Sequence, residues 1–208
     1  VDLREIPTFT IDGEKARDFD DAVSIQKEKD GGMTLYVSIS DVSHYVEEGT
    51  ALDEEAYLRG TSVYFPDRAI PMFPPELSNE ICCLHPDSDR LTLTVELRYE
   101  ARGNEKGVRF YPSVIRSSQR LTYTIVKKIL LDDDAELKKR YGDILQSLEW
   151  MADLSQTLRQ KRIERGALDF DLPEPEIILD LQGEAEVSVR AERKLAQQII
   201  EGFMIAAN

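Results

Sequence analysis

The sequence predicts an α+β domain built on a mixed, largely antiparallel sheet with packed helices. Three observations lead to this class. Alternating apolar and polar residues, rich in Val, Ile and Tyr, recur in the first part of the chain. After Thr122 the apolar residues repeat with a helical period of about 3.6. The 208 residues contain no internal repeat, low-complexity segment or linker, and a chain of this length can bury one sizeable core.

Two β-hairpins account for most of the predicted sheet. The first joins residues 22–29 to residues 33–42 through an Asp-Gly-Gly turn. The second joins residues 91–101 to residues 108–117 through a polar loop that contains glycine. Since hairpins pair neighbouring strands in opposite directions, the sheet is expected to be largely antiparallel.

The segment between the hairpins predicts a short helix and then a loop. Residues 52–60 carry acids in the first turn and end in glycine, which is typical of a helix. Four prolines follow, and their density predicts an ordered loop in place of regular structure. They are Pro66, Pro71, Pro74 and Pro75.

Helices are predicted after Thr122. Apolar residues at helical spacing indicate one helix around residues 125–130 and a longer one over residues 144–158. Gly166 is positioned to end the second helix.

The last part of the chain predicts two short strands and a helix. The strands, at residues 177–181 and 186–189, follow a stretch punctuated by proline. The helix, over residues 191–208, has no stop signal before the sequence ends. We therefore expect a domain truncated at its C-terminus.

Composition predicts a soluble, globular, cytoplasmic protein, with 41% hydrophobic and 32% charged residues. No apolar stretch approaches the roughly 18 residues of a membrane span, and the first residues lack signal-peptide features, so no membrane partner is expected. The only two cysteines, Cys82 and Cys83, are adjacent. They can neither close a long loop nor supply the paired spacing of a zinc site, which indicates a reducing compartment and buried, inert thiols.

The charge balance limits the possible partners. Forty acidic and 26 basic residues give a net charge of −14. A polyanion such as RNA is repelled by such a chain on average. A function on nucleic acid therefore requires a bound divalent cation, a local basic stripe or basic domains elsewhere in the protein.

Four aspartates, Asp12, Asp18, Asp20 and Asp21, lie within ten residues just before a predicted strand, and Glu14 adds a fifth acid. Crowded carboxylates repel one another, and this favours either proton uptake or a hard cation. Mg²⁺ fits because it prefers oxygen ligands and keeps waters for a substrate. Two such ions can hydrolyse a phosphodiester.

Other interpretations of the acidic run stay open at this point. Acids beside a turn usually form a solvated surface. An EF-hand loop that starts at Asp18 fits worse, because Ala22 and Val23 occupy positions that require an acid or amide and a glycine. A haloacid-dehalogenase-type Asp-x-Asp also fits worse, because no apolar strand precedes the motif.

Longer motifs resemble a known family. The segments IDGEKARDFDDAVS, GTSVYFPDR, RSSQRLTY, ERGALDF and IIEGFMIAAN occur in this order over nearly the whole chain. Together they resemble the catalytic RNB domain of the ribonuclease II and ribonuclease R family, with details closer to ribonuclease R. The resemblance implies that residues 1–208 are the N-terminal portion of an RNB-type catalytic domain.

The resemblance also implies an activity. Family members are Mg²⁺-dependent hydrolytic enzymes, with Mn²⁺ as a substitute, that digest single-stranded RNA from the 3′ end to nucleoside 5′-monophosphates. Asp12, Asp18, Asp20 and Asp21 are then the catalytic and metal-binding residues, and Asp20 is the one whose neutralisation abolishes chemistry most cleanly.

Further residues are implied in RNA binding. Tyr64 stacks on a base near the scissile end, and Phe170 clamps the terminal base from the opposite side. Glu201 resembles a position near the RNA end. Without the motifs, the two aromatics are most simply core residues and Glu201 an exposed helix residue. The cations expected to touch phosphate are Arg59, Arg68, Arg116 and Arg120.

The family context predicts what lies outside this chain. A second half of the domain supplies a catalytic arginine, and flanking cold-shock and S1 modules supply RNA affinity. The chain alone is therefore expected to be inactive, and the protein to be a monomer. The alternative is a catalytically silent RNB relative that serves as an RNA-binding or interaction module. Retention of all four aspartates favours the enzyme.

Overall fold

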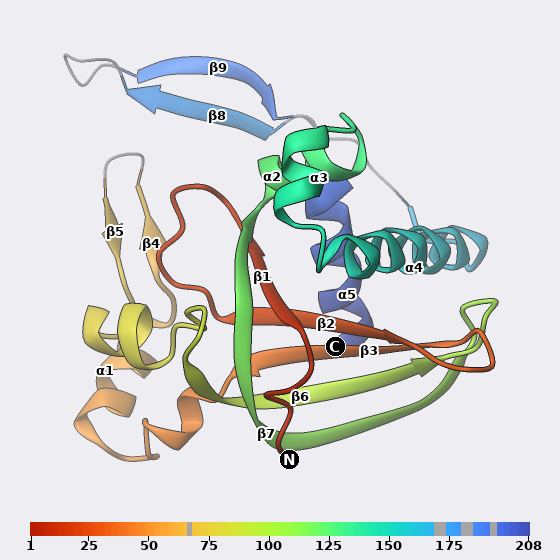
Figure 1. Cartoon of the computed structure of the whole chain (residues 1–208). Helices are drawn as coiled ribbons and strands as arrows, with labels where there is room; N and C mark the ends of the chain where they lie inside the picture. Colours follow the sequence, from red (N-terminus) through yellow and green to blue (C-terminus); the bar gives the residue numbers. More distant parts are fainter. Residues whose placement is uncertain (66–67, 169–173, 180–184, 192–194) are drawn as a thin grey trace.

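The computed structural model describes residues 1–65, 68–168, 174–179, 185–191 and 195–208 (Figure 1). Its centre is a closed five-stranded β-barrel with the strand order β1-β2-β3-β6-β7. All neighbouring strands run antiparallel except β1 and β7, which are parallel. The barrel strands are β1 (Thr8–Asp12), β2 (Asp21–Lys27), β3 (Met33–Ser40), β6 (Asp89–Tyr99) and β7 (Glu105–Thr122).

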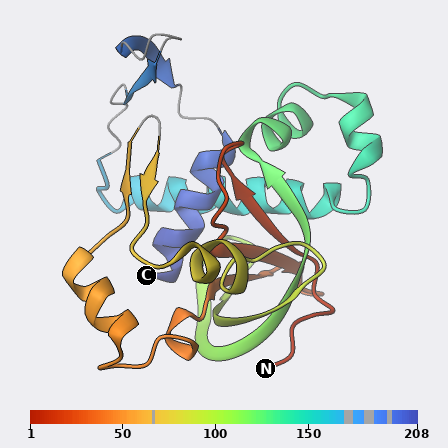
Figure 2. The same ribbon diagram turned by 90° about the vertical axis from the view of Figure 1, so that its left-hand side faces the viewer.

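Four helices cover one side of the barrel (Figure 1). Apolar side chains of β1, β2, β3 and β6 pack against buried residues of these helices, including Met151 and Phe203. In the view turned by 90°, α1 (orange) lies beside the barrel strands, and the β4–β5 hairpin extends above α1 (Figure 2). The covering helices are α2 (Tyr123–Leu130), α3 (Ala135–Arg140), α4 (Leu145–Glu164) and α5 (Leu195–Ala207).

The inner face of the barrel is lined by hydroxyl groups. Side chains alternate across a strand, so residues next to the helix-facing apolar positions point the other way. Thr8 and Ser24 share a hydrogen bond of 2.7 Å, and Thr94 bonds both Ser38, at 2.7 Å, and Ser113, at 2.6 Å. The five hydroxyls are buried, and their mutual bonds satisfy them away from water.

The remaining elements lie outside the barrel. They are η1 (Val42–His44), α1 (Ala51–Arg59), β4 (Val63–Tyr64), β5 (Ala69–Ile70), the π-helix η2 (Glu76–Ile81), β8 (Glu174–Leu179) and β9 (Ala185–Ala191). Thr50 caps the start of α1 by accepting a hydrogen bond from the Asp53 amide at 3.4 Å. Gly60 ends α1 with a φ of 72°, which favours glycine.

The predicted fold class is confirmed, as are both hairpins, the helix before Gly60 and the stop at Gly166. Closure of the sheet into a barrel was not predicted, and neither were β1 and α3. The proline-rich segment was predicted to be irregular, and this is wrong in part, because β4, β5 and η2 lie within or beside it. The short strands near the end are confirmed as β8 and β9, with residues 180–181 of the first prediction outside the described residues.

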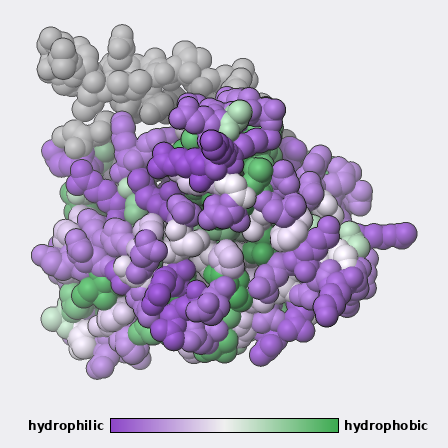
Figure 3. Space-filling view, in the orientation of Figure 1, coloured by the Kyte–Doolittle hydropathy of each residue, from purple (hydrophilic) through white to green (hydrophobic). Residues whose placement is uncertain are grey.

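The face in Figure 3 is predominantly hydrophilic, with apolar side chains in small groups. Within the described part of the chain, no helix has the length and apolar character to cross a membrane.

Candidate active site

The acidic run forms a loop at one end of the barrel. Asp12 is the last residue of β1 and Asp21 the first of β2, while Asp18 and Asp20 lie on the connection between them. The two strands are antiparallel, with Phe9 opposite Val23, so the end of β1 lies beside the start of β2. We call residues 13–20 the aspartate loop.

Burial and mutual repulsion perturb these carboxylates. Burial raises the pKa of Asp12 to about 7, and the charges of Asp21 and Asp20 add to the rise, while Arg120 opposes it. Burial, followed by repulsion from Asp20, raises the pKa of Asp21 to about 6. Burial also raises the pKa of Asp20, and Asp18 contributes. The site therefore holds carboxylates that favour a compensating positive charge or a proton.

Unmet hydrogen-bonding capacity surrounds the same loop. Among the described residues, four buried side-chain atoms lack a hydrogen-bond partner: Thr10 Oγ1, Asp12 Oδ2, Ser40 Oγ and Arg120 Nε. Thr10 and Arg120 are opposite each other in the β1–β7 ladder, and the Ser40 amide donates to the Asp20 carbonyl at 2.8 Å. Buried polar atoms without partners are uncommon. Three of them, on Thr10, Asp12 and Arg120, belong to the β1–β7 strand pair that flanks the aspartate loop.

The donor set suits a hard divalent cation, because carboxylate oxygens are the ligands that Mg²⁺ and Mn²⁺ prefer. Asp12 Oδ2 in particular is buried without a partner. Across the residues that the structure describes, no three or more His, Cys, Asp or Glu side chains are gathered closely enough to hold a metal ion. The residues fit such a cation by the chemistry of their oxygen donors, and a bound ion would have to draw these side chains closer together.

The segment that contains Cys83 anchors the aspartate loop. The Phe19 amide donates to Cys83 Sγ at 3.2 Å, and the Leu84 amide donates to the Phe19 carbonyl at 2.8 Å. Cys82 and Cys83 are both buried, as predicted, and burial raises the pKa of both thiols. Sequence analysis missed this anchoring role, because nothing in an isolated cysteine pair indicates which backbone it contacts.

Tyr64 reaches the aspartate loop from the β4–β5 hairpin. Its hydroxyl donates a hydrogen bond to Asp18 Oδ2 at 3.0 Å. Its side chain is otherwise open to solvent, since the residue is 68% exposed. The interpretation of Tyr64 as a core aromatic is therefore wrong, and its ring is available to a base.

The arginines expected to touch phosphate have protein partners. Arg59 donates to Glu55 and to the Pro71 carbonyl, each at 2.9 Å. Arg68 lies over the Phe65 ring, 5.3 Å from its centroid. Arg116 forms an ion pair with Asp89 at 2.6 Å. Arg120 contacts backbone carbonyls of the aspartate loop.

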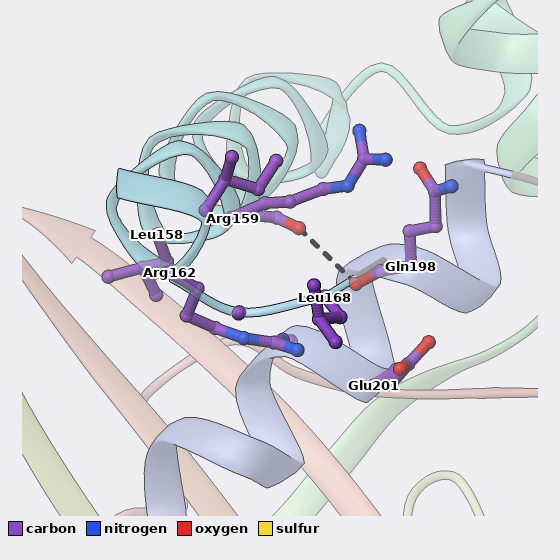
Figure 4. Close-up of a pocket in the computed structure, with 10 residues that line it drawn as sticks. Leu158, Arg159, Arg162, Leu168, Gln198 and Glu201 are labelled. Atoms are coloured by element: carbon purple, nitrogen blue, oxygen red, sulfur yellow. Dashed lines mark hydrogen bonds between the residues drawn. The ribbon is translucent and has the colours of Figure 1, made fainter. Parts of the chain in front are cut away.

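Glu201 lies on α5, where it lines a pocket between α4 and α5 (Figure 4). Arg159 and Arg162 line the same pocket from α4, together with the apolar side chains of Leu158 and Leu168. The structure thus groups Glu201 with two basic residues. Phe170 lies outside the described residues.

The fold and the acidic loop define an RNB-type domain. The family model described as "RNB domain" matches residues 1–208, and the chain belongs to this family. It is 49% identical over 207 residues to ribonuclease R of Aquifex aeolicus and 45% identical over 208 residues to ribonuclease R of Escherichia coli. Both alignments cover 100% of this chain but only 29% and 26% of the relatives.

Solved structures support the same fold assignment. RNase R of Mycoplasma genitalium, in complex with ribose-methylated single-stranded RNA, matches with a TM-score of 0.91 and 30% identity, over 100% of this chain and 32% of that chain. Yeast Ssd1, described as a pseudonuclease, matches with a TM-score of 0.73 and 18% identity, over 97% of this chain and 24% of that chain. The second likeness shows only the fold, so activity has to be argued from the site.

Proposed function

We propose that this chain provides the carboxylate portion of the catalytic centre of a 3′-to-5′ exoribonuclease, which hydrolyses single-stranded RNA to nucleoside 5′-monophosphates. One observation carries the proposal: in a chain of the RNB family, half-buried aspartates with raised pKa values, Asp12 and Asp21, lie at one end of the barrel, beside the exposed ring of Tyr64. The described residues offer nothing that favours a catalytically silent module.

Asp12, Asp18, Asp20 and Asp21 are the residues that would hold Mg²⁺, or Mn²⁺ in its place. When bound, such ions offset the phosphate charge, acidify the attacking water and stabilise the leaving oxygen. The aspartates orient this centre, and Asp20 is the one on which hydrolysis depends most. In the reaction the water oxygen bonds to phosphorus, the bond from phosphorus to the 3′ oxygen breaks, and that oxygen takes up a proton.

Stacking would hold the RNA end at the site. Tyr64 offers an exposed ring, and Phe170 is proposed to clamp the terminal base from the other side. Each stack is worth about 1–3 kcal/mol and ignores sequence, since every base has a π face. Arg59, Arg68 and Glu201 are proposed as further RNA contacts, with hydrogen-bonding groups nearby to sense the 2′-hydroxyl.

The rest of the catalytic protein is proposed to lie outside this chain. We assign residues 1–208 to the N-terminal portion of the RNB domain, followed by a second half with a catalytic arginine. Cold-shock and S1 modules would offset the net charge of −14 and attract RNA. A cytoplasmic monomer is the proposed setting.

The test uses a protein of ribonuclease R length that contains this chain, with the chain alone in parallel. A 5′-labelled single-stranded RNA is incubated with Mg²⁺, and products are resolved on a sequencing gel. The longer protein should give a ladder that shortens from the 3′ end and disappears with EDTA or Asp20→Asn. Asp143→Asn, at an exposed aspartate outside the loop, should leave the ladder intact.

The isolated chain is expected to give no ladder. Unchanged activity of Asp20→Asn, with an unchanged melting temperature, would contradict the metal assignment. If the longer protein also gives no ladder, the result would favour the alternative of a catalytically silent binding module.

A further inference from the structure

We infer that Arg120 is the positioning residue of the aspartate loop: from β7 it holds the loop backbone between β1 and β2, and so it sets where the aspartates of the site lie. The inference rests on the proposed function, because it concerns the same site. It changes the role of Arg120, which the sequence suggested as a phosphate contact.

One nitrogen of Arg120 holds the first half of the loop. Nη2 lies 3.4 Å from the Gly13 carbonyl oxygen, 3.2 Å from that of Glu14 and 3.4 Å from that of Ala16. A terminal guanidinium nitrogen carries two hydrogens, so the three carbonyls share them. The Ala16 amide also donates to the Gly13 carbonyl at 3.2 Å, which closes this part of the loop into a turn.

The same side chain holds the second half of the loop through Phe19. The guanidinium carbon lies 4.7 Å from the centroid of the Phe19 ring. Phe19 itself is buried, and Cys83 and Leu84 fix its backbone. A cation over an aromatic face is attracted by the ring, most strongly where water is excluded. Arg120 therefore joins both halves of the loop.

Arg120 lies on a strand that is paired with β1. Arg120 pairs with Thr10 in the parallel ladder between β7 and β1, and Asp12 pairs with Thr122 in the same ladder. The strand pair that carries Asp12 therefore also carries the support for the loop. A group built on paired strands is positioned more accurately than one on a loop.

Arg120 could contact phosphate or position the loop, and the acceptors of its hydrogen bonds favour the second role. The hydrogen bonds of its Nη2 go to backbone carbonyls, so they stabilise the loop without occupying aspartate oxygens. Nε is buried, and Nη2 is engaged by the loop. Positive charge beside Asp12 also eases the repulsion among the carboxylates. This arrangement leaves the aspartate oxygens available to a cation, while Nη2 of Arg120 is committed to the loop backbone.

The test measures Mn²⁺ affinity of the 208-residue chain by electron paramagnetic resonance, together with melting temperature and hydrogen exchange of the loop amides. Arg120→Gln should weaken Mn²⁺ binding by about tenfold or more, as loss of groups that orient ligands does. The exchange of amides 14–20 should accelerate while that of β2 and β3 stays unchanged. Arg120→Lys should recover part of the affinity, because an ammonium also offers several donors.

Arg109→Gln is the matched control, since Arg109 lies on the same strand and is exposed to solvent. It should leave Mn²⁺ affinity and loop exchange unchanged. Equal Mn²⁺ affinity of Arg120→Gln and the unaltered chain would overturn the inference. So would loss of all cooperative melting in Arg120→Gln, because Arg120 would then support the whole fold and not the loop.

Failure of the proposed function has a different outcome. If the unaltered chain binds no Mn²⁺, the metal assignment fails, and hydrogen exchange alone decides the role of Arg120. Faster exchange confined to residues 14–20 in Arg120→Gln would then support Arg120 as the residue that holds the loop backbone. Unchanged exchange would overturn it.

Discussion

Tyr64 combines an exposed ring with a hydroxyl bound to Asp18, so its ring is open to a stacking partner while its hydroxyl contacts a carboxylate. Only the ring is needed for stacking. The hydroxyl has a different effect, because it donates to an oxygen that the proposed cation would also use. The two contributions can be separated, since phenylalanine keeps the ring and removes the hydroxyl.

Tyr64→Ala should weaken binding of a short single-stranded RNA by about 1–3 kcal/mol, because a base loses its stacking partner. Tyr64→Phe should bind the RNA as the unaltered protein does. Fluorescence anisotropy with a labelled oligonucleotide, on a protein of ribonuclease R length that contains this chain, measures both. Equal weakening by Ala and Phe would mean that the hydroxyl, and not the ring, holds the RNA.

The surroundings of Glu96 predict that the thermal stability of the fold depends on pH. This effect is separate from the aspartate loop. Burial alone would raise the pKa of Glu96, but hydrogen bonds from Tyr111 and Arg98, each at 2.8 Å, outweigh it. The pKa therefore lies below its ordinary value of 4.5. A carboxylate whose pKa falls on folding stabilises the protein above its unfolded pKa, and this stability is lost as the pH falls through the folded value.

Glu96→Gln should accordingly lower the melting temperature at pH 7, and the difference from the unaltered chain should shrink as the pH falls below 4.5. Thermal melts across this range measure the effect. Glu100→Gln, at an exposed glutamate, is the control and should show little difference at either end. A difference that grows towards acid pH would refute this account of Glu96.

At the scale of elements, the hydroxyl-lined interior makes the barrel depend on hydrogen bonds as well as on apolar burial. Thr94 is central, because its hydroxyl bonds both Ser38 and Ser113. Thr94→Val keeps the shape of the side chain and leaves the Ser38 hydroxyl without this partner. Ser113 retains its contact with Thr92 at 2.8 Å.

Thr94→Val should destabilise the chain by about 1–3 kcal/mol, the cost of an unsatisfied buried polar group. Urea denaturation measures the change, and Thr61→Val, at an exposed threonine, should be nearly neutral. A stabilised Thr94→Val chain would indicate that apolar contacts dominate the interior.

The hairpins were predictable because their strands pair with near neighbours and their turns have characteristic residues. β1 was not, because its five residues form a short strand whose parallel partner lies more than a hundred residues away. α3 has six residues, and none of them is buried, so it carries no apolar periodicity. Barrel closure depends on these distant contacts and not on local pattern.

In the candidate site, too, local sequence patterns were predictable and contacts between distant residues were not. The aspartates could be proposed from the sequence because like charges cluster there. The backbone contacts of Arg120 could not, because their acceptors are carbonyls, which every residue possesses. The contact between Tyr64 and Asp18 joins positions 46 residues apart and follows only from the fold. Glu201 was identified through family resemblance alone.

At the scale of the whole molecule, the net charge of −14 predicts an unusual response to salt. Basic nucleic-acid-binding proteins lose affinity steeply as salt rises, since they release counterions from RNA. This chain repels RNA on average, and salt screens the repulsion over about 10 Å at 0.1 M. Binding of RNA by the isolated chain should therefore fall little, or rise, between low and moderate salt.

Anisotropy titrations of the chain with single-stranded RNA, at several concentrations of KCl, measure this dependence. Added Mg²⁺ should strengthen binding more than K⁺ at equal ionic strength. A steep loss of RNA affinity with rising KCl would instead indicate a basic surface whose attraction for RNA outweighs the negative net charge.

The parallel pairing of β1 with β7 has a consequence for the order of assembly. The Ser118 hydroxyl donates to the Thr8 carbonyl at 3.0 Å, across 110 residues of sequence. During synthesis, β1 emerges first and has no parallel partner until β7 follows. Asp12 and the support from Arg120 therefore come together only after both hairpins exist. The proposed nuclease is thus made in an unassembled form, while the nascent chain is still close to the RNA of the ribosome.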